Sequence, residues 1–147
     1  MKKAFTLLFV LFSVTQSFTA KSDVPSDLNG FKQAINNVHY LAKVKITKVE
    51  VSHEDDESEK HVYSADVLAT YKGETHKHIR YEMFVEQGED VVFNSAPVYI
   101  ALCVDNNATY YWPGTGSEFK YSSAIDSWLT ENKTKLNDMK SSAGWCE

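Results

Sequence analysis

Three histidines of the sequence are candidate metal ligands. His76 and His78 are two residues apart on a predicted strand, so their side chains point the same way. His61 lies on the neighbouring predicted strand, and three imidazoles could bind zinc or copper. The polar surroundings favour the alternative that these histidines are solvated on the outer face. We therefore keep them as weak metal candidates and expect no metal and no other cofactor.

An acidic run offers oxygen ligands. Residues 52–60 contain no apolar side chain and hold five carboxylates. Oxygen ligands at that density could bind calcium, but their spacing differs from that of an EF-hand loop. The run instead predicts a solvated hairpin tip, on which Asp55, Asp56 and Glu57 could provide an electrostatic contact for a basic partner.

Aromatic side chains surround the loop 113–116, which reads Pro-Gly-Thr-Gly. Aromatics beside a glycine-containing loop can form a platform for a sugar or a peptide. Tyr110 and Trp112 share one face of a predicted strand, and Tyr111 takes the other. The alternative is packing at the end of a barrel. The aromatic set comprises Tyr110, Tyr111, Trp112, Phe119 and Tyr121.

No group of residues with the pattern of a covalent catalyst is evident. Gly116-Ser117 lacks the Gly-x-Ser-x-Gly pattern of a nucleophile elbow. Cys103 lies within an apolar strand and is expected to be oxidised, which makes it a poor thiol nucleophile. No glycine-rich phosphate loop occurs either. The sequence therefore favours a protein that is not an enzyme.

Residues 1–20 are expected to be a signal peptide. Lys2 and Lys3 precede an apolar segment of about eleven residues, which is too short to span a bilayer as a helix. Cleavage after Ser17 or after Ala20 fits the sequence. A cleaved leader implies a periplasmic or secreted protein.

The expected mature chain, residues 21–147, suits a single domain. It carries 13 Lys+Arg against 20 Asp+Glu, a formal charge of −7. This charge argues against nucleic acid and against an anionic membrane surface as partners. No other long apolar segment occurs, so no membrane span is expected.

The most apolar run of the mature chain is Val98–Val104, which predicts a buried strand. It contains Cys103, and the only other cysteine is Cys146. Two cysteines in an exported chain usually form a disulfide, which here would join this strand to the C-terminal tail. The alternative is a pair of free thiols.

Hydrophobic periodicity predicts the remaining elements. A short helix begins at Ser26, and a longer one begins at Ser123 or Asp126. The apolar set changes parity at Val49, which indicates a bulge in the first strand. Predicted strands cover 39–51, 61–71, 76–86, 98–104 and 108–112, with a further short one at 119–122.

This order favours a mainly β fold with flanking helices. Five antiparallel strands with a bent first strand usually close as a barrel, because closure removes exposed edges. We expect an OB-like five-stranded antiparallel barrel with a short N-terminal helix and a C-terminal helix. A two-sheet sandwich is the alternative.

Three segments resemble the netrin/tissue-inhibitor-of-metalloproteinases superfamily in its secreted bacterial form. They are residues 40–50, residues 63–73 with their Tyr-Lys-Gly turn, and the apolar strand 98–103. The resemblance implies an OB-type barrel with a C-terminal helix. Inhibitors of that family bind the protease zinc through an N-terminal cysteine. Neither possible mature N-terminus has one, so the resemblance does not carry protease inhibition with it.

These observations favour an exported, non-enzymatic binding or accessory protein. Its partner would be another protein or a small extracytoplasmic ligand, bound by the 52–60 loop and the 110–121 region. The alternative is a secreted inhibitor of a hydrolase, of the protease or lysozyme type, that inserts loop 52–60 or loop 87–97 into a cleft. A small hydrolase is least favoured.

Overall fold

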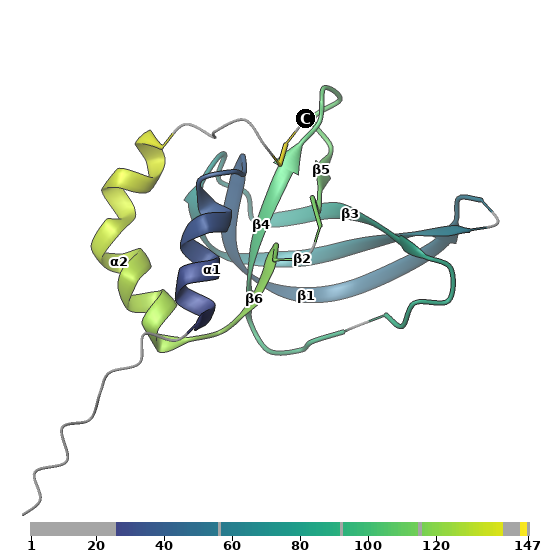
Figure 1. Cartoon of the computed structure of the whole chain (residues 1–147), viewed down its shortest axis with the longest axis horizontal. Helices are drawn as coiled ribbons and strands as arrows, with labels where there is room; N and C mark the ends of the chain where they lie inside the picture. Colours follow the sequence, from purple (N-terminus) through teal and green to yellow (C-terminus); the bar gives the residue numbers. More distant parts are fainter. Residues whose placement is uncertain (1–25, 56, 92, 115, 140–144, 147) are drawn as a thin grey trace, which may run out of the picture.

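A computed structural model describes residues 26–55, 57–91, 93–114, 116–139 and 145–146. It is mainly β with two helices (Figure 1), as predicted. The predicted signal peptide lies outside the described residues. The elements are α1 (Ser26–Ile35), β1 (Tyr40–His53), β2 (Ser58–Lys72), β3 (His78–Glu86), β4 (Val98–Val104), β5 (Tyr110–Tyr111), β6 (Glu118–Lys120) and α2 (Ser123–Asp138).

Five strands form a ring in the order β1, β2, β3, β5 and β4, and pairing of β1 with β4 closes it. The β1–β2, β2–β3, β4–β5 and β1–β4 pairs are antiparallel. β3 and β5 are parallel, with only Tyr81 and Glu82 in register with Tyr110 and Tyr111. The expectation of a wholly antiparallel arrangement is therefore wrong at this joint, which is as short as the β4–β5 joint.

β5 and β6 lie one after the other along the same edge of β4. Tyr111 is opposite Cys103, and Glu118 is opposite Ile100. The chain between them, 112–117, therefore bulges out opposite Leu102. Pro113 explains the interruption, because proline has no N–H to donate to a ladder. The bulge separates β6 from β3 and leaves the ring split on that side.

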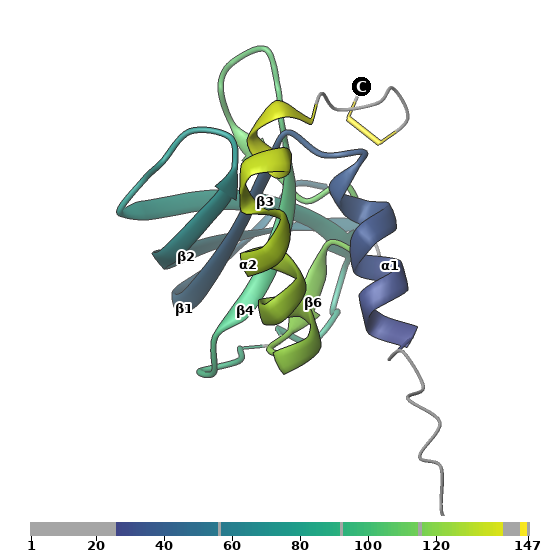
Figure 2. The same cartoon turned by 90° about the vertical axis from the view of Figure 1, so that its left-hand side faces the viewer.

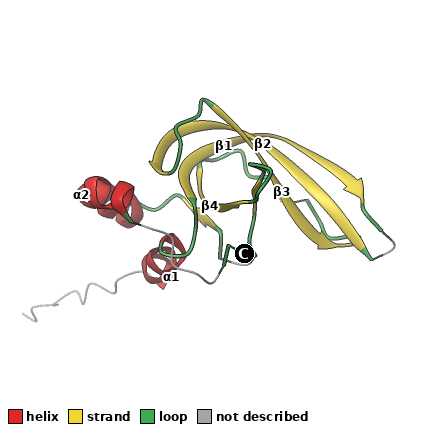
Figure 3. Ribbon diagram, turned by 90° about the horizontal axis from the view of Figure 1, so that it is seen from above, coloured by secondary structure: helices red, strands yellow, loops and turns green. Residues whose placement is uncertain are grey.

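β1 bends as the parity change predicts, with register shifts against β2 between Leu41 and Val44 and again between Ile46 and Lys48. Beyond the bend, β1 and β2 stay paired as far as His53. The predicted 52–60 tip is therefore too long, since strand pairing leaves only 54–57 as the turn. The resulting hairpin projects away from the helices (Figures 1 and 3).

The two helices lie together on one side of the ring (Figure 2) and cover a first core. Phe31 of α1 packs edge-on against Tyr99 of β4, with ring centroids 5.6 Å apart, and against Trp128 of α2 at 6.1 Å. Spacings of three and four residues place such apolar side chains on one helix face. The first core comprises Leu28, Phe31, Ala34, Ile35, Val38, Leu41, Tyr99, Ala101, Cys103, Ile125, Leu129 and Leu136.

A second core fills the inside of the ring. Alternate residues of β4 contribute to the two cores, so Ile100 and Leu102 face inward while Tyr99 and Ala101 face the helices. This explains why Val98–Val104 is apolar at every position. The second core comprises Tyr40, Ala42, Val44, Ile46, Tyr63, Ala65, Ile79, Tyr81, Val98, Ile100 and Leu102.

The predicted disulfide is present between Cys103 and Cys146, with Cα atoms 5.3 Å apart. It ties β4 to the tail across 43 residues of sequence. Among the described residues, neither helix has the length and apolar character needed to cross a membrane.

The Tyr-Lys-Gly turn after β2 holds α1 and β1 in place. Lys72 is buried, and its Nζ donates to the carbonyl of Ile35, the last residue of α1, at 3.0 Å. Burial lowers the pKa of Lys72. Gly73 has φ of +88°, and a Cβ there would lie 2.9 Å from the carbonyl oxygen of His39. Both residues are therefore fixed by the junction between α1 and β1.

Candidate functional site

His76 and His78 lie in different surroundings. β3 begins at His78, whose side chain is exposed and has Nδ1 2.8 Å from Asp66 Oδ1. His76 precedes the strand, is half-buried, and has Nε2 2.8 Å from the Tyr110 hydroxyl. The expectation that the two imidazoles share one strand face is wrong, because the strand starts two residues later than predicted. The solvated outer-face alternative holds for His78 only.

His61 is buried on the inward side of β2, so the outer-face alternative is wrong for this residue. Its Nε2 lies 3.5 Å from Oε2 of Glu59, which is also buried. Within the described ranges, one group of His, Cys and carboxylate atoms is close enough together for a metal, and it consists of His39, Cys103 and Cys146. Both sulfurs are already joined in the disulfide. The three candidate histidines therefore do not converge on a shared metal position.

The acidic hairpin tip uses several of its carboxylates internally: Glu54 Oε1 lies 2.9 Å from Lys60 Nζ, and Asp55 braces the turn. Asp55 Oδ1 accepts hydrogen bonds from the Glu57 N–H at 2.9 Å and from the N–H and hydroxyl of Ser58, both at 2.8 Å. These bonds lower the pKa of Asp55. Asp56 lies outside the described residues. Glu59 is 8% exposed, so the expectation that the whole acidic run is solvated is wrong for this residue.

The predicted aromatic platform is divided between the two cores. Tyr110 and Trp112 are half-buried against the core inside the ring. Tyr111 and Phe119 pack against the core beneath the helices. Tyr121 is 53% exposed. The five rings therefore do not form one surface, and Trp112 lines a cavity.

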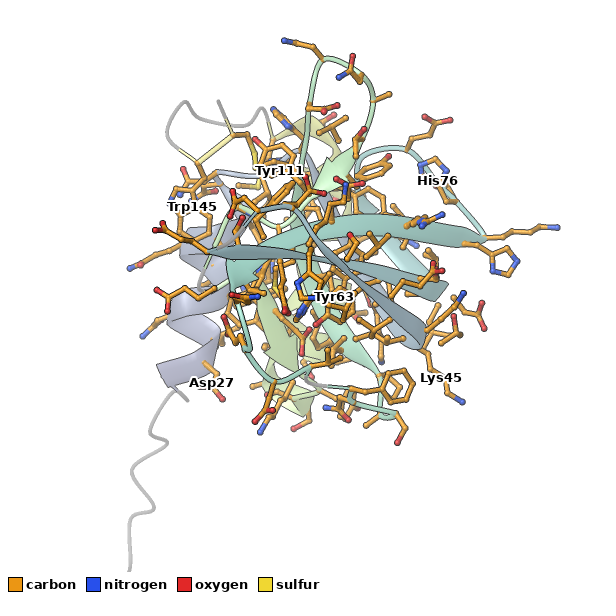
Figure 4. The ribbon with its side chains drawn as sticks, turned by 90° about the vertical axis from the view of Figure 1, so that its right-hand side faces the viewer. Asp27, Lys45, Tyr63, His76, Tyr111 and Trp145 are labelled. Carbon is orange, nitrogen blue, oxygen red and sulfur yellow. A yellow bond between two sulfur atoms is a disulfide. The ribbon has the colours of Figure 1, made fainter. Side chains whose placement is uncertain are left out.

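That cavity has a volume of about 310 Å³ and lies where the ring is split. β3, the 112–117 bulge and β6 border it, and the loop after β3 contributes Glu89 and Asp90. Figure 4 looks at the side of the molecule away from the helices, with Tyr63 near the middle of the view. The lining residues are Tyr63, Tyr81, Met83, Glu89, Asp90, Ile100, Leu102, Trp112, Gly116, Ser117 and Glu118.

Two tyrosines from neighbouring strands form one wall of the cavity. Tyr63 and Tyr81 are opposite each other in the β2–β3 register, and their rings stack with centroids 5.1 Å apart and planes inclined by 9°. Ile100 and Leu102 supply apolar surface from β4. Trp112 adds an aromatic side chain from the bulge. Its backbone N–H donates to the carbonyl of Glu82 in β3 at 2.8 Å. The walls are therefore built on strands, except at the bulge.

Two polar atoms of the lining residues lack a partner. Ser117 is fully buried, and its Oγ has no hydrogen-bond partner among the residues described. The same holds for the indole Nε1 of Trp112. Buried polar atoms are nearly always hydrogen-bonded, and one left unpaired is costly. Both atoms belong to residues that line the cavity.

The lining carries negative charge. Glu89, Asp90 and Glu118 contribute carboxyl groups, and the lining residues include no lysine, arginine or histidine. Burial of the Glu118 carboxyl raises its pKa, an effect that Lys120 partly opposes. Burial also raises the pKa of Tyr81, and the nearby charge of Glu118 adds to that effect. The cavity therefore disfavours further negative charge.

The lining offers groups for binding. Ser117 is the one serine among the lining residues. The lining contains no lysine or histidine that could activate its hydroxyl as a nucleophile. Aromatic faces, aliphatic side chains, an indole N–H, a hydroxyl and carboxylates are the groups that fix a small ligand in a pocket.

Sequence reasoning placed Trp112 in the site but missed its neighbours. Tyr63 and Tyr81 follow the alternation of their strands, which predicts core residues and not a site. Ser117 stands out only in a motif that lacks the nucleophile-elbow pattern, and no motif singles out Glu118. The available signal was the interrupted strand itself, because a proline and two glycines between two strand segments indicate a bulge that can expose an interior.

Comparison with known proteins adds no relative: neither protein-family models nor curated proteins match this chain.

Proposed function

We propose that this protein is an exported, non-enzymatic binding protein whose ligand occupies the cavity at the split in the strand ring. The observation that carries the proposal is a cavity lined by aromatic, aliphatic and carboxyl side chains from β2, β3, β4 and the segment that follows β5. A volume of about 310 Å³ suits a small organic molecule or one side chain of a protein partner.

Export is part of this proposal. The expected leader at residues 1–20 would deliver the domain 21–147 to the periplasm or the cell exterior. The Cys103–Cys146 disulfide supports this, because disulfides persist mainly in oxidising compartments. Its ligand or partner would therefore be extracytoplasmic.

We also propose that the ring is an OB-type barrel, as the netrin/tissue-inhibitor resemblance implies. A five-stranded ring in which β5 makes only short joints with β3 and β4 fits a partly open OB barrel. The position of the cavity at the β3–β5 joint then follows from the incomplete closure between β3 and the interrupted fifth strand.

The test is an NMR screen of the mature, oxidised protein with a chemically diverse set of small fragments. The indole N–H of Trp112 is the reporter. The indole of Trp128, which packs on Phe31 beneath the helices, is the internal control. We expect a subset of fragments to shift the Trp112 signal in a saturable manner and to leave the Trp128 signal in place.

Two variants test whether the fragments bind inside the cavity. Met83→Phe adds bulk at the cavity and should weaken the fragments that bind, whereas Leu68→Phe, at a site 52% exposed, should not. If no fragment shifts Trp112, or if Met83→Phe and Leu68→Phe behave alike, the cavity is not a binding site.

A second candidate function, a secreted inhibitor of a hydrolase, is favoured by the hairpin. β1 and β2 project from the ring (Figure 3), and the three hydrogen bonds to Asp55 brace the turn. A braced, projecting loop is suited to entering a cleft. Residual activity of secreted proteases and of lysozyme would be measured with the wild type and with Asp55→Ala. Inhibition by the wild type that Asp55→Ala weakens would support this function, and full residual activity would reject it.

A further inference from the structure

We propose that the cavity binds an organic ammonium cation, as carried by a small alkyl amine or by a lysine side chain. This inference rests on the proposed function, because it names the chemical class of the ligand for that cavity. Three features of the lining carry it: an excess of carboxyl groups, aromatic rings from β2, β3 and the segment after β5, and aliphatic side chains.

The charge of the lining selects a cation. Glu118, Glu89 and Asp90 face the cavity without a basic residue in the lining to pair with them. All three residues are exposed at the surface. A ligand ammonium group beside Glu118 would gain a charge-assisted hydrogen bond, whereas a carboxylate or phosphate ligand would add repulsion.

The aromatic walls favour the same charge. An ammonium group is attracted to the face of a tyrosine or tryptophan ring by the ring quadrupole. The stacked pair of Tyr63 and Tyr81 lies on β2 and β3, and Trp112 lies on the bulge. Met83 and Leu102 provide apolar surface for the methylene groups that follow the ammonium group. The cavity thus fits a charged head attached to a short alkyl chain.

Isothermal titration calorimetry on the oxidised mature protein tests this inference. The probes are putrescine and butane-1,4-diol, which have the same carbon chain with and without charge. We expect putrescine to bind at least about tenfold more tightly than the diol, because it gains charge-assisted hydrogen bonds and ring contacts.

Variants of Glu118 test whether its carboxylate contributes to putrescine binding. Glu118→Gln should weaken putrescine by about tenfold and leave the diol unchanged. Glu131→Gln, an exposed glutamate on α2, is the matched control and should change neither. Glu118→Lys, which reverses the charge, should abolish putrescine binding. Circular dichroism of each variant confirms that it is folded before titration.

The outcomes distinguish a lysine side chain from a free amine as the ligand. They also distinguish failure of the ammonium inference from failure of the proposed binding function. Tighter binding of N-acetyl-lysine methylamide than of putrescine would identify a lysine of a partner protein, and the reverse would identify a free amine. If putrescine binds no better than the diol, or Glu118→Gln and Glu131→Gln act alike, the inference is overturned. Neutral fragments that still shift Trp112 would then leave the proposed binding function intact, and a silent fragment screen would reject both.

Discussion

Tyr63 and Tyr81 lie opposite each other on β2 and β3 with their rings stacked, 5.1 Å apart and inclined by 9°. Both rings line the cavity at the split in the ring of strands. Burial raises the pKa of each phenol, and the charge of Glu118 adds to that effect. The pair therefore remains neutral across the physiological range and presents its ring surface to the cavity.

Substitutions at Tyr81 should separate the ring from its hydroxyl. Tyr81→Phe keeps the stack and should bind putrescine within about twofold of the wild type, whereas Tyr81→Leu removes ring contacts and should weaken it about fivefold. Calorimetry measures both affinities. Equal losses in the two variants would mean that the hydroxyl, and not the ring, contributes to binding.

Asp126 joins α2 to the ring of strands. Its Oδ1 accepts from Lys43 Nζ at 3.0 Å and from the Tyr99 hydroxyl at 2.8 Å. Asp126→Asn should lower the free energy of unfolding at pH 7 by about 1 kcal/mol, a small figure because the side chain is 39% exposed. Urea denaturation measures this, with Glu131→Gln as the control on the same helix.

The cost of Asp126→Asn should depend on pH. The bonds from Lys43 and Tyr99 hold the pKa of Asp126 below its ordinary value of 3.8. The folded state therefore gains stability from this carboxylate above pH 3.8, and loses it as the pH falls through the folded pKa. The two urea midpoints should converge in this acidic range. A constant difference down to the lowest pH would contradict the ion pair as the cause.

The disulfide should contribute a large share of the stability. A link between Cys103 and Cys146 restricts a segment with a sequence separation of 43 in the unfolded chain, which corresponds to about 4 kcal/mol in the chain-entropy account. The double variant Cys103→Ala with Cys146→Ala should lower the urea midpoint accordingly. The wild type after reduction should match it, and an unchanged midpoint would contradict a stabilising disulfide.

Two glycines form a matched pair for testing the turn after β2. Gly73 and Gly88 have φ of +88° and +81°, but a Cβ at Gly73 would lie 2.9 Å from a carbonyl oxygen, whereas nothing lies within 4 Å at Gly88. Gly88→Ala should cost about 1 kcal/mol for the backbone alone. Gly73→Ala should cost at least about 2 kcal/mol, because the clash adds to that cost. Equal losses in thermal unfolding would show that the junction with His39 can move aside.

Periodicity predicted the elements with regular burial. The continuous apolar run at Val98–Val104 is a strand between two cores, and the parity change near Val49 coincides with a bend in β1. The disulfide followed from two cysteines in a chain whose leader predicts export. These features depend on local pattern, which a sequence contains in full.

The errors arose where long-range pairing decides structure. β1 and β2 extend through polar residues because their backbones hydrogen-bond to each other. A prediction from composition alone therefore made the hairpin tip, 52–60, too long. Glu59 and His61 are buried through their place on the inward face. The β3–β5 joint is parallel because a closed ring of five strands cannot have every neighbouring pair antiparallel, and the cavity lies where Pro113 follows the short β5.

The central claim, that this cavity holds an organic ammonium ligand, is tested most directly by intermolecular nuclear Overhauser effects. Putrescine labelled with carbon-13 would be added to the oxidised mature protein. We predict contacts from its methylene protons to the ring protons of Tyr63, Tyr81 and Trp112. Contacts confined to the exposed acidic hairpin around Asp55 and Glu57, or no contacts at saturating putrescine, would contradict the account.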